Sequence, residues 1–177
     1  MKAKDIIDYA SNRLLKRSID IEDGIAWIND CLLTEMGKDA LVYGEVVLSD
    51  CKPKQRYDLP EDFIAVKAVY DERGDKNTDW TADGTQISFT NKGTYTVKYH
   101  RVPAITINKT NVSTTEPDCH PMLHQVIPYY LAYRFLNIDF AADKETEIRY
   151  LEFQSKFNER LSETQKQSRF IKVNPWM

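Results

Sequence analysis

The sequence is poor in cysteine and glycine. Its three cysteines, Cys31, Cys51 and Cys119, are odd in number and irregularly spaced, which is typical of small buried thiols in a reducing compartment rather than of a disulfide framework. The 177 residues include six Gly, and the sequence has neither a Gly-rich phosphate-binding loop nor a Ser nucleophile elbow. These absences argue against a nucleotide-binding site and against serine hydrolase chemistry.

An excess of positive charge and a long apolar segment are also missing. The net charge of −3 argues against tight, sequence-neutral binding to phosphate backbones, which needs a basic surface. The most apolar stretch, residues 122–136, includes His124, Pro128 and Arg134 and is too short to cross a bilayer. The first residues hold no continuous apolar region, so no signal peptide is expected. The sequence predicts a soluble protein with no membrane partner.

Tyrosine is the residue type in excess, with ten copies against seven Phe and three Trp. A tyrosine has an apolar body and a polar tip, so this enrichment suits large, half-wet interfaces as well as a core. The chain length suits one domain, or a core with a smaller lobe.

The first third of the sequence has the apolar spacing of two helices, over residues 3–15 and 21–36. Asp20 is expected to cap the second helix and Gly37 to end it. The apolar stripe of the second helix consists of Ile21, Ile25, Ile28, Leu32 and Met36.

The last third predicts two further helices. Pro121 opens the first, which runs to about residue 137; it is apolar nearly all round, which predicts burial at the centre of a helical bundle. Pro128 within it predicts a kink. The other helix begins at Asp139 or Asp143. Its inward stripe consists of Tyr150, Phe153, Phe157 and Leu161.

Between these helical segments lie short β-branched runs separated by turn residues, which predict strands. The expected strands cover residues 42–48, a segment from Arg56 that ends at Pro60, and residues 64–70, 85–90 and 94–100. The last two flank Asn91-Lys92-Gly93, which predicts a three-residue hairpin with Gly93 at a positive φ.

These elements predict an α+β fold that is mainly α, a discontinuous four-helix bundle with an inserted small antiparallel β lobe. The expected parts are residues 1–39 and 120–167 for the bundle, 40–103 for the β lobe, 104–119 for a connector loop and 168–177 for a C-terminal tail. The connector is rich in Thr, Asn and Pro and is longer than a usual loop, which is typical of functional or disordered segments.

One histidine pair has a metal-site spacing. His120 and His124 stand four apart at a helix start, which can place two imidazoles on one face to bind zinc. Pro121 stands where the zincin pattern needs a Glu, so a helix cap and a packing histidine are the favoured interpretation. A zinc-dependent hydrolase built on this pair is the competing hypothesis.

The cysteines and the carboxylate pairs give no catalytic pattern. A nucleophilic cysteine needs a base and an electropositive setting, and the sequence shows neither. The carboxylate pairs have nothing that distinguishes them from capping or solvated groups; they are Glu61 with Asp62 and Glu145 with Glu147. The sequence predicts no catalytic residue, no cofactor and no metal.

The predicted hairpin carries interleaved basic and aromatic residues, which suggests a nucleic-acid platform. They are Lys92, Lys98, Arg101, Phe89, Tyr95 and Tyr99, with Lys109 shortly after. A small nucleic-acid-binding module that uses the 85–100 hairpin face is therefore the alternative function. Tyr95 and Tyr99 share one strand face with Val97, which favours a core face beside a solvated face.

Several segments along the chain form an ordered set of motifs. In chain order they are Asp5-Ile-Ile-Asp-Tyr-Ala10, Trp27-Ile-Asn-Asp30, Tyr57-Asp-Leu-Pro-Glu-Asp-Phe63, Tyr99-His-Arg-Val-Pro103 with the polar connector after it, Ile127-Pro-Tyr-Tyr-Leu-Ala-Tyr-Arg134, Ala141-Ala142, and 150–157. In their order and spacing the chain resembles the adaptor proteins (head-completion or tail-accessory proteins) of the head-to-tail connector of tailed bacteriophages.

The resemblance implies a non-catalytic structural subunit of the virion neck, assembled in the host bacterial cytoplasm. Such subunits form a ring, commonly of twelve copies, that docks on the portal protein above and on tail or stopper proteins below. Genomic DNA passes through the ring during ejection without specific binding. A ring needs large heterologous contact faces, which tyrosine-rich amphipathic helices supply.

The C-terminal tail is the predicted protein interface. Phe170, Ile171, Val173 and Trp176 lie beyond the last predicted helical stripe, and clustered exposed apolar residues are typical of contact surfaces. We expect a monomer or weak oligomer that becomes a stable ring only on its portal.

Overall fold

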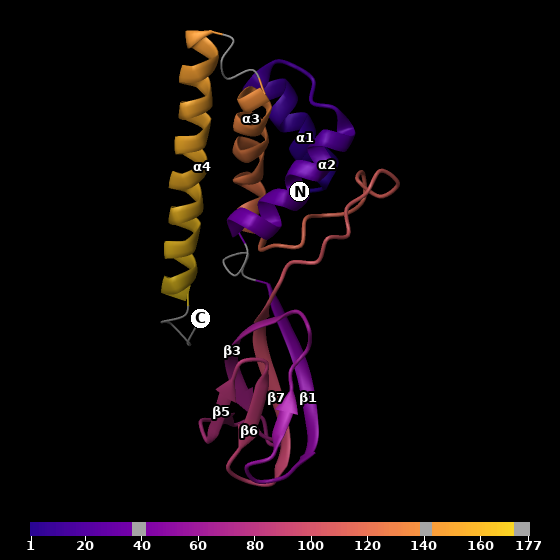
Figure 1. Cartoon of the computed structure of the whole chain (residues 1–177), viewed down its shortest axis with the longest axis vertical. Coiled ribbons are helices and arrows are strands. Elements are labelled where there is room, and N and C mark those ends of the chain that lie inside the picture. The colour runs from indigo at the N-terminus through magenta and orange to yellow at the C-terminus, as the bar shows by residue number, and fades with distance from the viewer. Residues whose placement is uncertain (37–41, 139–142, 172–177) are drawn as a thin grey trace. The chain divides into compact units, whose positions relative to one another are not determined.

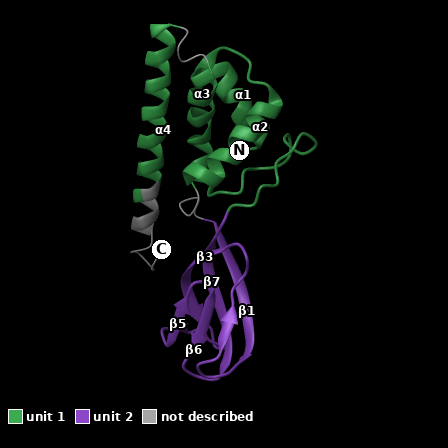
Figure 2. Ribbon diagram, in the orientation of Figure 1, with its two compact units in different colours: residues 1–40, 103–177 green, residues 41–102 purple. Residues whose placement is uncertain are grey.

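The structure, a computed structural model, describes residues 1–36, 42–138 and 143–171, without the side chains of residues 165 and 167–171. It divides into two compact units (Figure 2). The helical unit consists of residues 1–40 and 103–177, and the β unit of residues 41–102. Within the described residues no helix combines the length and the apolar character needed to cross a membrane.

The helical unit contains regular and irregular helices (Figure 1). Segments η1 and η2 are π-helical and η4 is a 3₁₀-helix. In chain order the segments are α1 (Ala3–Tyr9), η1 (Ala10–Leu15), α2 (Ile21–Asp30), η2 (Cys31–Met36), η4 (Pro121–Gln125), α3 (Ile127–Ile138) and α4 (Lys144–Ile171).

Local sequence signals set most helix starts. Asp20 caps α2 as predicted, because its Oδ1 accepts from the backbone N–H of Glu22 at 2.8 Å. Asp143, one of the two predicted starts, accepts from the N–H of Thr146 at 2.8 Å at the start of α4. Lys16, with a left-handed φ of 55°, ends η1 where the apolar pattern stops. The predicted stop at Gly37 and the alternative start at Asp139 lie outside the described residues.

In place of the predicted kink at Pro128, the structure has a boundary between two helical segments. The segment that Pro121 opens divides near Val126 into η4 and α3, so Pro128 falls in the first turn of α3. The first turn of a helix has backbone N–H groups without helical partners, so a proline there removes no helical hydrogen bond.

Helix α3 is the centre of the helical unit. It is buried along almost its whole length, as predicted, and contacts α1, α2, η1 and α4. Helix α4 runs antiparallel beside it (Figure 1) and turns Phe153 and Phe157 inward, where they are 7% and 1% exposed. The Phe157 ring lies 5.4 Å from that of Tyr130 and 5.8 Å from that of Tyr133.

The predicted fold class, a mainly α four-helix bundle, is wrong. Helices make up 44% and strands 25%, so the fold is mixed α/β, and the helices do not form a clear bundle. Both N-terminal helices change from α- to π-helical geometry, at Ala10 and at Cys31. Apolar spacing does not distinguish the two windings over so few turns, and the sequence interpretation also missed the short strands of the β unit.

The β unit is built from two antiparallel sheets. One has the order β1-β7-β3-β4 and the other β2-β6-β5. The strands are β1 (Tyr43–Cys51), β2 (Arg56–Asp58), β3 (Phe63–Tyr70), β4 (Lys76–Asn77), β5 (Trp80–Asp83), β6 (Gln86–Phe89) and β7 (Gly93–Arg101). The inner faces of the two sheets share one core; its buried members are Cys51, Leu59, Val69, Ile87, Phe89, Tyr95 and Val97.

The predicted hairpin around Asn91-Lys92-Gly93 is wrong. Strand β6 pairs with β2 and β5, whereas β7 pairs with β1 and β3, so the chain passes from one sheet to the other between them. Gly93 does not take the positive φ that the hairpin needs; Gly74 and Gly84 are the described glycines that do. The ring centroids of Phe89 and Tyr95 lie 3.9 Å apart, and the stacked rings belong to the core between the two sheets. Burial of both rings in this core favours the passage from one sheet to the other over a flat hairpin.

The connector is ordered on the helical unit rather than loose. The N–H groups of Ala3 and Lys4, at the start of α1, donate to the carbonyls of Thr115 and Val112 at 2.9 and 3.0 Å. Ile107 and Val112 are each 5% exposed. The length of the connector therefore serves to cover α1, whose first backbone N–H groups have no helical acceptors.

Candidate functional site

The histidine pair is structural. The Nδ1 of His120 accepts from the N–H of Met122 at 3.3 Å and caps η4, while His124 is 2% exposed. Both ring nitrogens of His124 have partners: Nδ1 lies 2.7 Å from the N-terminal ammonium of Met1, and Nε2 lies 3.2 Å from the carbonyl of Pro117. Burial, and then the nearby ammonium, lower the pKa of His124. The favoured interpretation, a cap and a packing histidine, is confirmed.

The described part of the chain has no cluster of side chains suited to metal binding or to thiol chemistry. Among those residues no three His, Cys, Asp or Glu side chains gather in a way that can hold a metal ion. Cys31, Cys51 and Cys119 are buried free thiols, as predicted. Burial raises the pKa of Cys31, and it raises that of Cys119 to about 12, so neither thiol forms a reactive thiolate near neutral pH.

The proposed nucleic-acid platform does not assemble. Phe89, Tyr95 and Tyr99 are 1%, 3% and 5% exposed, so their rings belong to the core and offer no face for base stacking. Lys98 pairs with Glu45 across the sheet at 3.5 Å. Lys109 belongs to the helical unit, where it pairs with Glu22. The prediction of a core face beside a solvated face is confirmed for β7.

Two of the sequence motifs meet inside the helical unit. The carboxylate of Asp30, in the Trp27–Asp30 motif, accepts from the Tyr130 hydroxyl and lies 3.7 Å from the Arg134 guanidinium. Burial first, and then the Asp30 carboxylate, raise the pKa of Tyr130, so this hydroxyl stays protonated and donates. The Nδ2 of Asn29 lies 3.5 Å from the carbonyl of Ile107 in the connector. This motif therefore joins α2 both to α3 and to the connector.

Two further motifs meet inside the β unit. Asp62, in the 57–63 motif, accepts from the Tyr99 hydroxyl at 3.1 Å, and its backbone carbonyl accepts from the N–H of Val102 at 2.8 Å. The Phe63 ring lies 5.8 Å from that of Tyr99. Asp62, considered in the sequence as one of a carboxylate pair, is thus a structural hydrogen-bond acceptor. Its partner Glu61, and Glu145 and Glu147 on α4, are exposed.

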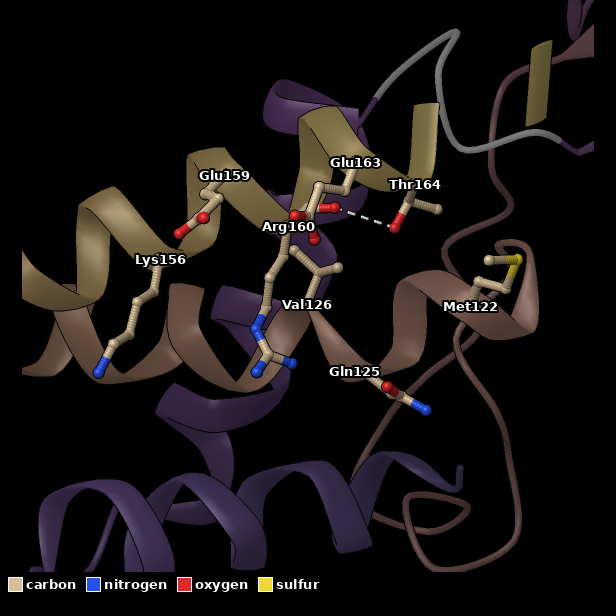
Figure 3. A pocket seen from close by; sticks show the side chains of 8 residues that line it. All are labelled: Met122, Gln125, Val126, Lys156, Glu159, Arg160, Glu163 and Thr164. Atoms are coloured by element: carbon tan, nitrogen blue, oxygen red, sulfur yellow. Dashed lines mark hydrogen bonds between the residues drawn. The ribbon is translucent and has the colours of Figure 1, made fainter. Parts of the chain in front are cut away.

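A groove of about 520 Å³ lies between α4 and the η4 segment of the helical unit (Figure 3). Lys156 and Arg160 extend from α4 with their charged ends on the same side, and Met122 and Gln125 come from η4. The lining residues are Met122, Gln125, Val126, Lys156, Glu159, Arg160, Glu163 and Thr164. Such a mixed-charge lining suits a protein surface better than a small apolar ligand.

A second, more apolar recess of about 250 Å³ adjoins the first at Gln125 and Arg160, which line both. Its other lining residues are Met1, Tyr9, Pro128 and Tyr129. The Arg160 guanidinium lies over the Tyr129 ring at 4.6 Å. Tyr9 is 42% exposed. We call the two recesses together the α4 groove.

The predicted tail site falls only partly within the described structure. The backbone of Phe170 and Ile171 continues α4, but their side chains, and all of Val173 and Trp176, lie outside the described residues. The structure brings other apolar residues to the surface of α4: Ile148 and Leu151 are 58% and 51% exposed. The sequence interpretation missed this pair, although two apolar residues three apart on an otherwise polar face are a readable signal.

The α4 groove had no such signal. Its lining comes from α1, the η4–α3 segment and α4, which are distant in sequence, and no single periodic pattern marks it.

No protein-family model matches the chain, and a comparison with curated proteins gave no significant match.

Proposed function

We propose that this chain is a non-catalytic adaptor subunit of a phage head-to-tail connector, forming a ring beneath the portal that joins it to tail or stopper proteins. Genomic DNA passes through the ring without specific binding. The subunit belongs to the neck of the virion and is made in the host bacterial cytoplasm.

The observation that carries this proposal is the pairing of the adaptor-like motifs. Asp30 joins the 27–30 motif to Tyr130 and Arg134 of the 127–134 motif, and Asp62 joins the 57–63 motif to Tyr99. These contacts give the motifs a structural role inside each unit, which suits a non-catalytic subunit. The residues concerned hold the chain together and leave the surface for partners.

The absence of a chemical role is part of the proposal. The buried thiols have pKa values raised by burial, and both nitrogens of His124 are hydrogen-bonded, so these groups suit structure rather than catalysis. The nucleic-acid alternative loses its main support because Phe89, Tyr95 and Tyr99 lie in the core.

The C-terminal tail remains our candidate for the contact with the portal. Deletion of residues 168–177, which removes the last turn of α4, should lower the helical circular-dichroism signal only slightly and abolish portal binding. If the truncated chain still decorates portals, or unfolds, the tail is not the docking element.

The decisive experiment mixes the purified chain with the portal protein encoded in the same phage genome and images the product by negative-stain microscopy. We expect a ring of chain copies, probed for twelve-fold symmetry, on the portal. Salt-dependent binding to short duplex and single-stranded DNA, measured in parallel, should be weak. Undecorated portals together with tight DNA binding would overturn the proposal in favour of a nucleic-acid-binding module.

A further inference from the structure

Helix α4 exposes an apolar pair on the face that points away from the core. Ile148 and Leu151 are three residues apart and so lie on one face of the helix. Phe153 and Phe157 lie on the opposite face and are buried. Removing apolar side chains of this size from water is favourable, so the exposed pair is a natural contact element.

The α4 groove lies on another side of the same helix. Its apolar part is lined by Tyr9, Pro128 and Tyr129, and it continues past Gln125 and Arg160 into the charged part. Because the pair and the groove are different surfaces of one unit, a contact between them would be heterologous, and repetition of a heterologous contact generates a ring or a filament.

The charges around the two surfaces allow ion pairs between them. Glu145 and Glu147, in the first turn of α4, are exposed beside the apolar pair. The groove presents the cations Lys156 and Arg160 on one side (Figure 3). The groove also contains Glu159 and Glu163, and Lys144 precedes the acidic turn, so both surfaces offer partners of either sign.

We infer that the α4 groove receives the Ile148–Leu151 face of a second copy of this chain. The apolar pair enters the part lined by Tyr9, Pro128 and Tyr129, and the acidic first turn of the incoming α4 faces Lys156 and Arg160. The inference rests on the proposed function in one respect, since a ring adaptor needs a head-to-tail contact between copies, and it names the surfaces that make this contact.

The test is site-specific cross-linking between two differently tagged chains, without any portal. One chain carries Leu151→Cys and the other Tyr9→Cys, and the native cysteines are buried and react little. A short thiol-reactive cross-linker applied to a concentrated mixture should give a species that contains both tags. The matched control replaces Tyr9→Cys by Leu33→Cys, an apolar position that is 47% exposed in the same unit but does not line the groove. This control should give no cross-link.

A second measurement removes the apolar pair without touching the core. Leu151→Lys should weaken self-association, followed by sedimentation velocity over a concentration series, by about tenfold or more. Ser113→Lys adds the same charge to an exposed position of the connector, outside α4 and outside both recesses, and should leave self-association nearly unchanged. The melting temperatures of both variants should stay close to that of the parent, because both positions are exposed.

Besides a missing Tyr9–Leu151 cross-link, three results would overturn the inference. One is an equal yield of cross-links to Leu33→Cys, and another is self-association that is unaffected by Leu151→Lys. The third is efficient cross-linking of Leu151→Cys to itself, which would indicate a two-fold contact between equivalent faces. Portal-bound rings without the Tyr9–Leu151 cross-link would leave the proposed function standing and remove this contact; the cross-link without portal binding would do the reverse.

Discussion

The two units of the molecule build their cores in different ways. The β unit takes its core from one continuous stretch, residues 41–102, whereas the helical unit combines the first 36 residues with residues 103–171. Tyr130 reaches Asp30 across 100 positions of sequence, and Tyr99 reaches Asp62 across 37. The difference shows that the β unit finds its partners within one continuous stretch of chain, while the helical unit depends on contacts between two segments that the β unit separates.

The largest test of this comparison is Phe157→Ala. Phe157 is 1% exposed among the Tyr130 and Tyr133 rings, so the cavity should cost about 3–5 kcal/mol of the free energy of unfolding of the helical unit. Urea unfolding followed by far-ultraviolet circular dichroism measures this loss, and hydrogen exchange of the β7 amides reports the β unit separately. We expect the β7 amides to keep their protection.

The control is Asn158→Ala, the exposed neighbour, which should change the stability by less than about 0.5 kcal/mol. If Phe157→Ala lowers the protection of β7 as much as that of α3, the two units unfold as one cooperative body and the contrast between them fails.

Substitution of one glycine in each unit compares how tightly the two units are packed. A Cβ at Gly44, in β1, would lie 2.3 Å from the Tyr99 Cζ and 2.5 Å from its hydroxyl oxygen. Tyr99 is buried and its hydroxyl is bound to Asp62, so the ring cannot easily move aside, and Gly44→Ala should cost about 1–3 kcal/mol.

The matched change in the helical unit, Gly24→Ala, should cost less. Its Cβ would lie 2.7 Å from the Cδ1 and 2.8 Å from the Cγ1 of Ile7, but alanine in place of glycine in a helix recovers about 1 kcal/mol and offsets part of this clash. Thermal unfolding of the two single variants compares them directly. A larger loss for Gly24→Ala would show that the α1–α2 contact is the more rigid of the two.

A smaller effect is expected from the hydroxyls that join the motifs. Tyr130→Phe removes the bond to Asp30, and Tyr99→Phe removes the bond to Asp62. Each should cost about 1 kcal/mol, since the net value of a hydrogen bond to a charged group is reduced where the carboxylate is partly exposed, as Asp30 is. Denaturant midpoints of the two variants measure the losses; no loss in either would remove the structural role that we assign to the paired motifs.

The smallest effect is a pH dependence that belongs to the helical unit. The pKa of His124 is lowered in the folded protein from its ordinary value of 6.5, so below pH 6.5 the unfolded chain binds a proton that the folded chain resists. The stability from this group is therefore complete above pH 6.5 and is lost as the pH falls toward the folded pKa, by at most about 1.4 kcal/mol per pH unit. Melting curves from pH 7.5 to 5 should show this slope, and His124→Gln should flatten it. An identical slope in both proteins would place the effect elsewhere.

The helices were the most predictable part of the fold. The 3.6-residue spacing located α1, α2, α3 and α4, and capping chemistry located starts at Asp20 and Asp143. The spacing did not predict the π-helical segments, because a change of winding over six residues shifts an apolar stripe too little to read.

Strand pairing was less predictable than strand position. Strands near β6 and β7 were predicted, but the actual hairpin joins β5 and β6 through Gly84, which follows Asp83 and has a φ of +60°. The two-residue turn Gly84-Thr85, with Gly at its first position, is a readable hairpin signal, yet β5 is exposed over most of its length and shows no buried alternation. The α4 groove was beyond prediction since three distant segments line it, whereas the exposed Ile148–Leu151 pair was readable from the polar face that it interrupts.

The hydrogen bonds from the start of α1 to the connector set an order of events during synthesis. The N–H groups of Ala3 and Lys4 find their acceptors only when Val112 and Thr115 have left the ribosome. Synthesis proceeds at roughly 5–20 residues per second, so residues 37–115, which include the β unit, take roughly 4–16 s. During this time the apolar faces of the first 36 residues lack these partners. They remain exposed to water, so we expect this segment to be prone to aggregation, or to be bound by a chaperone that recognises apolar segments, until the connector emerges.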